Sequence, residues 1–360
     1  MQINVYHRKD GRWEGRIRKS EKKCSKRMYR YIYGKTKESV ISMLQEIYHK
    51  EKTFHICDKI LSQIFEEWFT NVKQKVKIST ACNYLMKAKK HILPEFGEKT
   101  ISSIQKDSLY SFIKTLQSKK LSSRYIRDIL VLLSSVFKYA VNTYHIYNPF
   151  DDVVIPKKKY SDVKLLDEDE QQILRDELFS NPNRTTLGIA LSYYTGIRIG
   201  ELCALQWKDI DIEKRLLTVR KTVQRIQLPY GTPKTKVIIT EPKSESSVRV
   251  IPIPDCIITL MKIYKGNLDD FILSGKEKPT EPRTMQYRFN SFLKNVGLPS
   301  IHFHALRHLF ASNCIKLGAD VKSLSEILGH SSVEITLNRY VHSSFEMKRE
   351  YLNRLDFRGK

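Results

Sequence analysis

The sequence predicts a multidomain protein that is mainly α-helical with a small β component. The chain has 360 residues, which is enough for two or three domains. Apolar residues recur at helical spacing over most of residues 58–147 and 163–360, whereas strand-like alternation is confined to residues 1–57 and to the stretch around PYGTP. We therefore expect an N-terminal β-sheet plus helix, a helical bundle, and a mixed α/β domain at the C-terminal end.

The first 57 residues are expected to form a small basic domain. VYHRKDGRWEGRIRKS and RMYRYIYG have the alternation of short strands around a DG turn, and residues 35–50 have helical apolar spacing at Val40, Met43, Leu44 and Ile47. This domain has 15 Lys and Arg against six Asp and Glu. A strand face laid in a DNA groove, or a solvated charged face, explains the arginines interleaved with Tyr and Trp. These are Arg12, Arg16, Arg18 and Arg30.

Residues 58–147 are expected to form a four-helix domain. The four apolar periodicities are separated by the turn signals PEFG and SKKLSS, and Ser79 and Ser122 are expected N-caps. Residues 148–162 contain two prolines and a Lys run without helical period, which predicts an extended linker before a last domain at 163–360. The cations expected to contact phosphates are Lys87, Lys90, Arg124 and Arg127.

The overall charge predicts a polyanionic partner. Lys and Arg number 63 against 39 Asp and Glu, a formal net charge of +24, and nucleic acid rewards many weak cationic contacts. A basic but indifferent surface is the alternative. The chain has no apolar tract of membrane-spanning length, no leader-like start, and six scattered cysteines without a CxxC pair. We therefore expect a cytoplasmic protein with free thiols and no membrane partner.

The segment HALRH at residues 304–308 poses a choice between a metal site and an anion site. His304 and His308 share a helix face, but Arg307 would put a permanent positive charge beside the ion, and the HExxH pattern of zinc proteases is absent. We therefore predict no metal. An apolar stripe from Leu306 to Leu317 would leave His304 and Arg307 on the opposite face, where they can grip one anionic group.

Four further segments supply residues of the same chemical kind. TGIRIGEL places Arg198 after a glycine turn, with Glu201 three residues on to hold its guanidinium. EPKSESSVRVIPI supplies Lys243, and LGH places His330 after Gly329, an expected left-handed helix stop. Tyr340 follows ten residues later.

These five segments, in their order along the chain, resemble the catalytic domain of the tyrosine recombinases, the phage-type integrases. The resemblance runs through residues 165–345 at the level of motifs. The helical domain resembles the core-binding domain of that family more loosely, and the basic N-terminal domain resembles the arm-binding domains of integrases from mobile elements.

The resemblance implies a role for each residue. Tyr340 would attack a DNA phosphodiester and become joined to a 3′ phosphate, and Lys243 would protonate the leaving 5′ oxygen. Arg198 and Arg307 would clamp the non-bridging oxygens. The supporting roles implied are proton removal by His304, a hydrogen bond to the phosphate from His330, and orientation of the first arginine by Glu201.

The function implied is site-specific recombination that integrates and excises a conjugative transposon or phage, without metal, ATP or other cofactor. The implied partners are double-stranded DNA at core and arm sites, three further copies of the chain in a synaptic tetramer, and accessory excision or DNA-bending proteins. The alternatives are DNA relaxation like that of a type IB topoisomerase, chromosome-dimer resolution and non-catalytic DNA binding.

Some residue assignments have alternatives. Lys234 and Lys236 are alternative candidates for the role of Lys243, while His302, His308 and His342 are expected to be supporting residues. The segment FEMKREYLNRLDF is expected to dock on a neighbouring subunit or fold back on its own domain.

Overall fold

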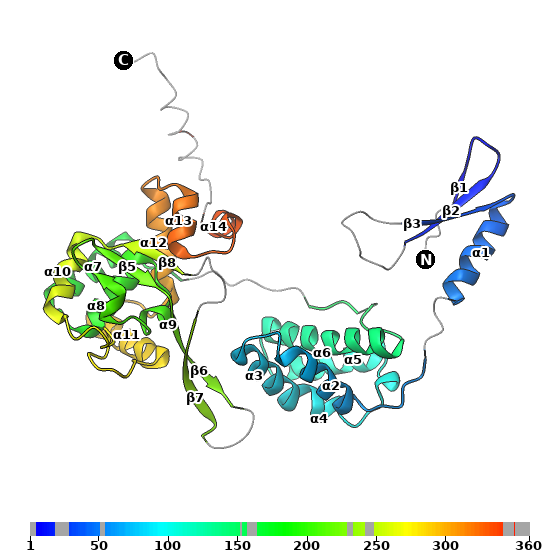
Figure 1. Ribbon diagram of the computed structural model, residues 1–360, viewed down its shortest axis with the longest axis horizontal. Helices are drawn as coiled ribbons and strands as arrows, with labels where there is room; N and C mark the ends of the chain where they lie inside the picture. The colour runs from blue at the N-terminus through cyan, green and yellow to red at the C-terminus, as the bar shows by residue number, and fades with distance from the viewer. Residues whose placement is uncertain are drawn as a thin grey trace, which may run out of the picture. The chain divides into compact units, whose positions relative to one another are not determined.

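A computed structural model of the protein describes residues 5–18, 29–50, 55–151, 153–156, 164–228, 233–241, 248–340 and 349. The chain divides into two compact units, Met1–Lys159 and Tyr160–Lys360. Helices predominate and the β component is small, as the sequence predicts (Figure 1). The strands of the described residues form three small sheets. Among the described helices, none combines the length and the apolar composition that crossing a membrane requires.

The chain starts with an antiparallel sheet covered by one helix. The elements are β1 (Val5–His7), β2 (Trp13–Arg18), β3 (Tyr29–Gly34) and α1 (Lys37–Lys50), with sheet order β1-β2-β3. Gly11 supplies the positive φ that the predicted DG turn requires. Val40 and Leu44 of α1 are buried against the sheet, where a Cβ at Gly15 would lie 2.6 Å from Leu44 Cδ1. Met43 belongs to the same apolar spacing, but its side chain is exposed.

Residues 55–156 form a separate helical bundle, the helical unit. Its elements are α2 (Leu61–Lys73), α3 (Ile78–Lys87), the π-helical turn η1 (Ala88–Ile92), α4 (Leu93–Phe96), the 3₁₀ turn η2 (Ile101–Ser103), α5 (Lys106–Ser118) and α6 (Ser123–Tyr144). Leu61, Ile64, Phe65 and Trp68 recur at the spacing that gives α2 one apolar face. All four are buried in a core shared with α5 and α6.

The structure corrects three local expectations about this unit: the N-cap at Ser79, the turn at PEFG and the start of the linker. Ser122 does cap α6 by accepting from the Tyr125 amide, but α3 begins at Ile78, so Ser79 lies inside the helix. The PEFG turn is part of a short helix, α4, because proline is tolerated in a first helical turn. The first part of the expected linker is not simply extended chain, because Phe150 is buried in the helical core and Val153 packs against it.

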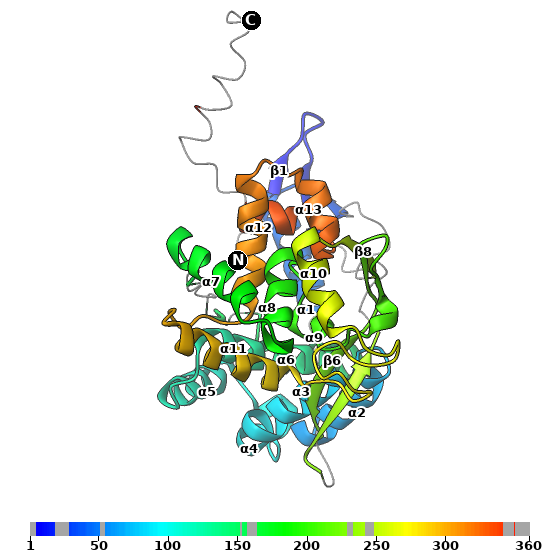
Figure 2. The same cartoon turned by 90° about the vertical axis from the view of Figure 1, so that its left-hand side faces the viewer.

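The C-terminal unit is built around the buried helix α8, which Figure 2 shows among its neighbours. Its helices are α7 (Glu168–Ser180), α8 (Arg184–Thr195), α9 (Ile199–Leu202), α10 (Asp255–Tyr264), α11 (Pro282–Val296), α12 (His304–Lys316), α13 (Val321–Leu328) and α14 (Val333–Tyr340). Helix α8 packs against α7, α10, α11 and α12. Asn183 caps its first turn, and it ends at Gly196 with a φ of +64°. This left-handed end redirects the chain toward Arg198.

Two small sheets complete this unit. The 3₁₀ turn η3 (Trp207–Asp209) leads into β4 (Ile210–Asp211), which pairs with β5 (Leu216–Val219) and then β8 (Arg249–Pro252) in an antiparallel sheet. Strands β6 (Thr222–Gln227) and β7 (Thr235–Thr240) form the predicted hairpin, which projects from the unit in Figure 1. The RVIPI segment belongs to the first of these sheets and not to the hairpin, since β8 pairs with β5.

Candidate active site

The candidate active site forms where α9 meets the C-terminal end of α13. Arg198 precedes the first turn of α9, and Glu201 lies in that turn. The Arg198 amide donates to Glu201 Oε2 at 3.0 Å, and its Nη1 donates to Glu201 Oε1 at 2.8 Å. Arg198 Nη2 donates to the carbonyl of Gly329 at 3.1 Å. The Arg198 side chain is 35% exposed, so it is held by the protein and still accessible from outside.

A second guanidinium belongs to Arg307 on α12, a residue that is 2% exposed. It donates from Nη1 to the carbonyl of Gly196 at 2.8 Å and from Nη2 to the carbonyl of Leu328 at 2.6 Å. Burial first, and then the nearby charge of Arg198, lower the pKa of Arg307 to about 9. The group is still a cation at neutral pH, and an anion beside it would relieve the charge repulsion.

A third arginine and one carboxylate complete this cluster. Arg249 at the start of β8 is buried, donates from Nη2 to Glu201 Oε2 at 2.8 Å and donates from Nε to the carbonyl of Ile327 at 2.6 Å. Burial alone would raise the pKa of Glu201, but the hydrogen bond from Arg249 and the charges of Arg249 and Arg198 outweigh it and lower that pKa. We call Arg198, Arg249 and Arg307 the arginine cluster; their net charge with Glu201 is positive.

Tyr340 ends α14 with its side chain 7% exposed, packed in a small apolar cluster with Leu324 and Leu328. The ring of His330 lies parallel to the Tyr340 ring, with centroids 6.3 Å apart and an interplanar angle of 2°. His330 Nδ1 is 2.8 Å from Oγ1 of the fully buried Thr336. This contact fixes the imidazole at the corner that follows Gly329, which has the left-handed φ that the sequence predicts.

Two further histidines lie on α12, and one of them contacts the Tyr340 ring. The His308 ring is 5.4 Å from the Tyr340 ring, and the His304 ring is 5.0 Å from the His308 ring. His308 is buried, whereas His304 at the start of the helix is exposed. The site therefore combines a phenol, imidazoles and a net positive arginine cluster, which is a chemistry suited to an anionic substrate.

The structure brings most of the predicted catalytic residues together. Arg198 and Arg307 donate to two neighbouring carbonyls at the end of α13, and Glu201 accepts from Arg198. His330 lies at the corner that follows, and Tyr340 ends the next helix, α14. Lys243 lies outside the described residues, as does His342. Of the competing lysines, Lys234 precedes β7 and Lys236 lies in it, and both are exposed. The segment at 345–357 that was expected to dock lies outside the described residues, except for residue 349.

The expected division of α12 into an apolar and a free face is wrong. Leu317 follows the helix and is 87% exposed, whereas Arg307 is buried on the face that was expected to be open. The reason is that α12 is enclosed by α8, α13 and α14, so both faces have neighbours. The guanidinium is accommodated there because two carbonyls accept its protons.

One residue of the site, Arg249, was missed by sequence reasoning. Arg249 alternates with Ile251 and Ile253 in RVIPI, and this period of two places it on the buried face of its strand. An arginine is rarely buried unless it is paired. The position of Arg249 on a predicted buried face could therefore have identified it as a residue with a charged partner. His308 was expected to be a supporting residue, and its position against the Tyr340 ring agrees with that expectation.

The predicted DNA-contacting residues of the N-terminal sheet lie in different places. Arg16 is in β2, exposed, with its guanidinium 5.6 Å from the Tyr6 ring centroid. Arg12 precedes β2, pairs with Asp10 at 2.8 Å and lies over the Tyr33 ring. Arg18 and Arg30 belong to β2 and β3, but their side chains are outside the description.

The four cations predicted for the helical unit also differ from one another. Lys90 and Arg124 are exposed. Lys87 is largely covered and 3.3 Å from Asp128, and Arg127 donates to the carbonyl of Pro156 at 3.2 Å. Lys90 and Arg124 are therefore the better placed pair for phosphate contacts.

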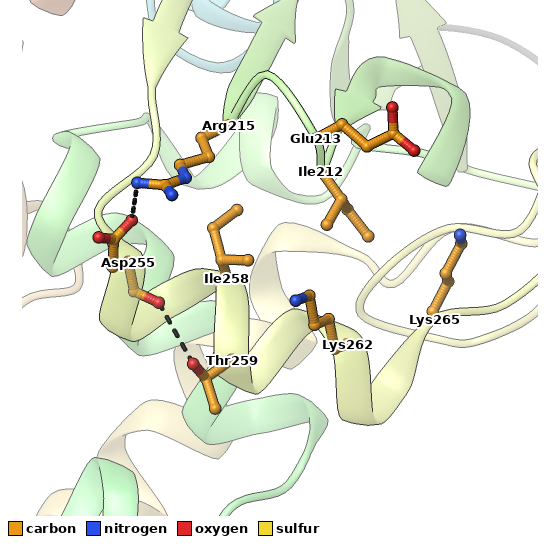
Figure 3. Close-up of a pocket in the computed structure, with 8 residues that line it drawn as sticks. All are labelled: Ile212, Glu213, Arg215, Asp255, Ile258, Thr259, Lys262 and Lys265. Carbon is orange, nitrogen blue, oxygen red and sulfur yellow. Dashed lines mark hydrogen bonds and ion pairs between the residues drawn. The ribbon is translucent and has the colours of Figure 1, made fainter.

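A hollow of about 590 Å³ lies between the β4–β5 turn and α10. Figure 3 shows the side chains that line it. Three cations, Arg215, Lys262 and Lys265, and two carboxylates, Glu213 and Asp255, line it. Asp255 already pairs with Arg215. The hollow contains none of the predicted catalytic residues, and its mixed charge gives no preference for an anion.

Comparison with known proteins places these observations in context. The family model described as "Phage integrase family" matches residues 164–347, and the model "Phage integrase, N-terminal SAM-like domain" matches residues 60–117. A protein of Caldanaerobacter subterraneus named "Tyrosine recombinase XerC-like" is 27% identical over 343 residues, which covers 86% of this chain and 87% of the relative. The ICEBs1 integrase of Bacillus subtilis is 26% identical over 303 residues, covering 78% and 79%.

Solved structures share the fold. The Tn1549 transposon integrase in complex with a circular intermediate DNA has a TM-score of 0.68 at 24% identity, covering 82% of this chain and 99% of the other. A lambda integrase tetramer bound to a Holliday junction has a TM-score of 0.58 at 19% identity, covering 96% and 99%. The predicted fold class is thereby confirmed.

Proposed function

The chain belongs to the phage integrase family, and from that premise we propose that it is a site-specific tyrosine recombinase that integrates and excises a mobile element. Tyr340 is the nucleophile. Its oxygen forms a bond to the scissile phosphorus as the bond from phosphorus to the 5′ oxygen breaks, which leaves a 3′ phosphotyrosine and a 5′ hydroxyl. His304 assists removal of the phenolic proton, and Lys243 donates a proton to the leaving oxygen. A second 5′ hydroxyl then attacks the phosphotyrosine and releases the enzyme.

The observation that carries this proposal is the convergence of Arg198 and Arg307 on the corner that leads to Tyr340. Arg198 contacts the carbonyl of Gly329 and Arg307 that of Leu328, directly before His330, whose ring faces Tyr340. A phosphate held by the two guanidiniums would lie next to the nucleophile. In this arrangement His330 donates a further hydrogen bond to the phosphate, and Glu201 orients the first arginine.

The charges suit this chemistry because a phosphodiester gains negative charge in its pentacoordinate transition state. Donors held in position before the reaction stabilise that charge without reorganisation, and each is worth about 3 to 4 kcal/mol. Two guanidiniums and an ammonium provide this stabilisation from the chain's own residues. The ester is exchanged for another ester and not hydrolysed, so rejoining needs no ATP.

The DNA contacts are proposed to divide among three parts of the chain. The N-terminal domain would bind arm sites through Arg12, Arg16, Arg18 and Arg30. The helical unit would bind core sites through Lys90 and Arg124, with lesser roles for Lys87 and Arg127. The C-terminal unit would bind the core sites through its catalytic residues. Four copies would assemble at synapsis, as four copies of lambda integrase do on a Holliday junction. Accessory excision or DNA-bending proteins would set the direction, and the reaction would take place in the cytoplasm, where the DNA lies.

Covalent trapping tests the proposal. Labelled duplexes spanning the ends of the DNA element that encodes the chain would carry a nick beside the presumed cut, so that the short 5′ fragment diffuses away and religation fails. Wild type should yield a denaturant-resistant protein and DNA band, and Tyr340→Phe should yield none while binding the same duplexes in a native gel. Binding by both proteins with no covalent band from either would favour a non-catalytic DNA-binding protein.

Two enzymatic alternatives give different results in the same set of assays. A type IB topoisomerase would relax a supercoiled plasmid without the element's sites, whereas we expect relaxation or recombination only with those sites. A chromosome-dimer resolvase would recombine without arm-type sequences, whereas we expect deletion of residues 1–57 to abolish integration while leaving covalent trapping on core duplexes.

A further inference from the structure

We propose that Arg249 is a positioning residue for DNA cleavage, which acts by fixing the two groups that aim Arg198 at the scissile phosphate. This inference rests on the proposed function, since it concerns the same reaction. The two groups are the Glu201 carboxylate and the C-terminal end of α13. Arg249 contacts both of them, and both of them contact Arg198.

The contacts form a closed loop of hydrogen bonds. Glu201 accepts from Arg198 on Oε1 and from both Arg249 and the Arg198 amide on Oε2. With its Oε2 side fixed by two donors, the carboxylate cannot rotate away from the Arg198 guanidinium. Because Glu201 is the acceptor that Arg198 uses on α9, the orientation of Arg198 depends on Arg249. The coupling runs through Glu201, since two guanidiniums are both donors and cannot hydrogen-bond to each other.

The second half of the loop is the end of α13. The last carbonyls of a helix have no partners within the helix and carry its negative partial charge, so cations stabilise them. Here the carbonyls of Ile327, Leu328 and Gly329 accept from Arg249, Arg307 and Arg198 in that order. Arg249 therefore fixes the first of three consecutive carbonyls, the last two of which hold the arginines proposed to bind the phosphate.

The position of Arg249 on the sheet makes it a rigid support. It begins β8, where it pairs with Val219 of β5, and it is 8% exposed. An arginine can bridge the two partners because Nε and Nη2 are two separate donors held in one planar group. Lysine concentrates its donors on a single atom, so it would keep the charge and lose the bridge.

The first experiment measures single-turnover cleavage of the nicked duplex by wild type, Arg249→Gln and Arg249→Lys, with DNA affinity measured separately in native gels. Residues that orient a catalytic metal ligand without touching the metal contribute about 10- to 100-fold to activity. We expect a loss in that range for Arg249→Gln, with DNA affinity near that of wild type. Arg249→Lys should recover only part of the loss, because it retains the charge without the two-point contact.

A substrate with a methylphosphonate at the scissile position separates positioning from a general structural effect. This group lacks one negatively charged oxygen, so it depends less on a well-aimed guanidinium. We expect the Arg249→Gln defect to become much smaller on it, in parallel with the defect of Arg198→Lys. Equal defects of Arg249→Gln on phosphate and methylphosphonate, or no defect on either, would overturn the proposal.

Arg220→Gln provides a matched control. Arg220 pairs with the buried carboxylate of Asp209 and donates to the carbonyl of Lys208 at 3.3 Å, so its loss removes a similar two-point contact in the same unit. We expect this variant to cleave as wild type does.

If Arg249→Gln fails to fold, Arg249→Lys and the double variant Arg249→Lys with Arg198→Lys still test the proposal. Positioning through Arg198 predicts that the losses of cleavage rate from the two substitutions are not additive. Absence of cleavage by wild type would instead contradict the proposed function.

Discussion

Replacement of Glu201 by glutamine is the perturbation whose effect follows most directly from the geometry. Glu201 is the single carboxylate that hydrogen-bonds to Arg198 and to Arg249 in the described part of the site. Glutamine keeps the shape of the side chain, but it removes the negative charge and turns an NH₂ donor toward a guanidinium that also donates. The variant therefore removes the negative charge that these two arginines share, without creating a cavity.

The magnitude depends on how well each arginine is shielded from water. Removing one partner of a buried ion pair costs about 3 to 5 kcal/mol, because the remaining charge stays buried. Arg249 and Glu201 are both almost inaccessible, so this range applies to their pair. Arg198 is 35% exposed, and water screens its share of the loss. We expect the free energy of unfolding of the C-terminal unit to fall by about 3 to 5 kcal/mol.

Denaturant and thermal unfolding of the full chain measure this loss. For a unit of this size each kcal/mol lowers Tm by about 2 to 4 °C. Glu281→Gln, which breaks the more exposed pair with Arg225, should lose at most about 1 kcal/mol. Added sulfate should stabilise Glu201→Gln more than wild type, because an anion can replace the lost charge. A loss below about 1 kcal/mol, with no extra effect of sulfate, would refute the reasoning.

The pH dependence of the same variant has a definite sign. The pKa of Glu201 is lowered in the folded chain, where its hydrogen bond and ion pair with Arg249 outweigh burial. The ionised carboxylate therefore stabilises the fold fully above its unfolded pKa of about 4.3, and this contribution is lost as pH falls through the lower folded value. The stability difference between wild type and Glu201→Gln should be constant from pH 6 to 8 and shrink below about pH 4.

Three further predictions concern other parts of the chain. Gly196→Ala should destabilise by about 1 to 3 kcal/mol more than Gly297→Ala in thermal unfolding, because both have positive φ but a Cβ at Gly196 would lie 2.5 Å from Phe310. His91→Leu should stabilise by about 1 to 3 kcal/mol at pH 7, because neither ring nitrogen of this buried His has a hydrogen-bond partner among the described residues. Burial lowers the pKa of His91, so stability should fall as pH drops below about 6.5 in wild type and less in the variant. Arg16→Gln should reduce the slope of log affinity against log salt for arm-type duplexes by about 0.9; an unchanged slope would exclude a phosphate contact.

The elements of the fold that could be predicted are those with strong local signals. Apolar periodicity located the helices of both units, and Gly11, Gly196 and Gly329 marked turns because the left-handed region favours glycine. Ser122 was found as an N-cap because it directly precedes an apolar period. The prediction that Ser79 is an N-cap was wrong because the helix already begins at Ile78. The preference of serine for N-cap positions does not decide between helix starts that differ by one or two residues.

The candidate site was predictable in its residue types and not in its architecture. Recognisable motifs contain the predicted residues Arg198, Glu201, Arg307, His330 and Tyr340. These motifs do not reveal that three arginines contact the end of one helix. That arrangement depends on tertiary contacts between α9, α12, α13 and β8. For the same reason Arg307 was expected on an open face, although it is buried against carbonyls that lie far away in the chain.

Identification of the residue that becomes joined to DNA tests the central claim most directly. Wild-type protein trapped on a nicked duplex would be digested with nuclease and trypsin, and the modified peptide would be sequenced by mass spectrometry. Cleavage after Arg339 and Lys348 yields YVHSSFEMK, which contains one tyrosine. The proposal predicts a nucleotide joined through its 3′ phosphate to Tyr340. A nucleotide on any other residue, or one joined through a 5′ phosphate, would contradict it.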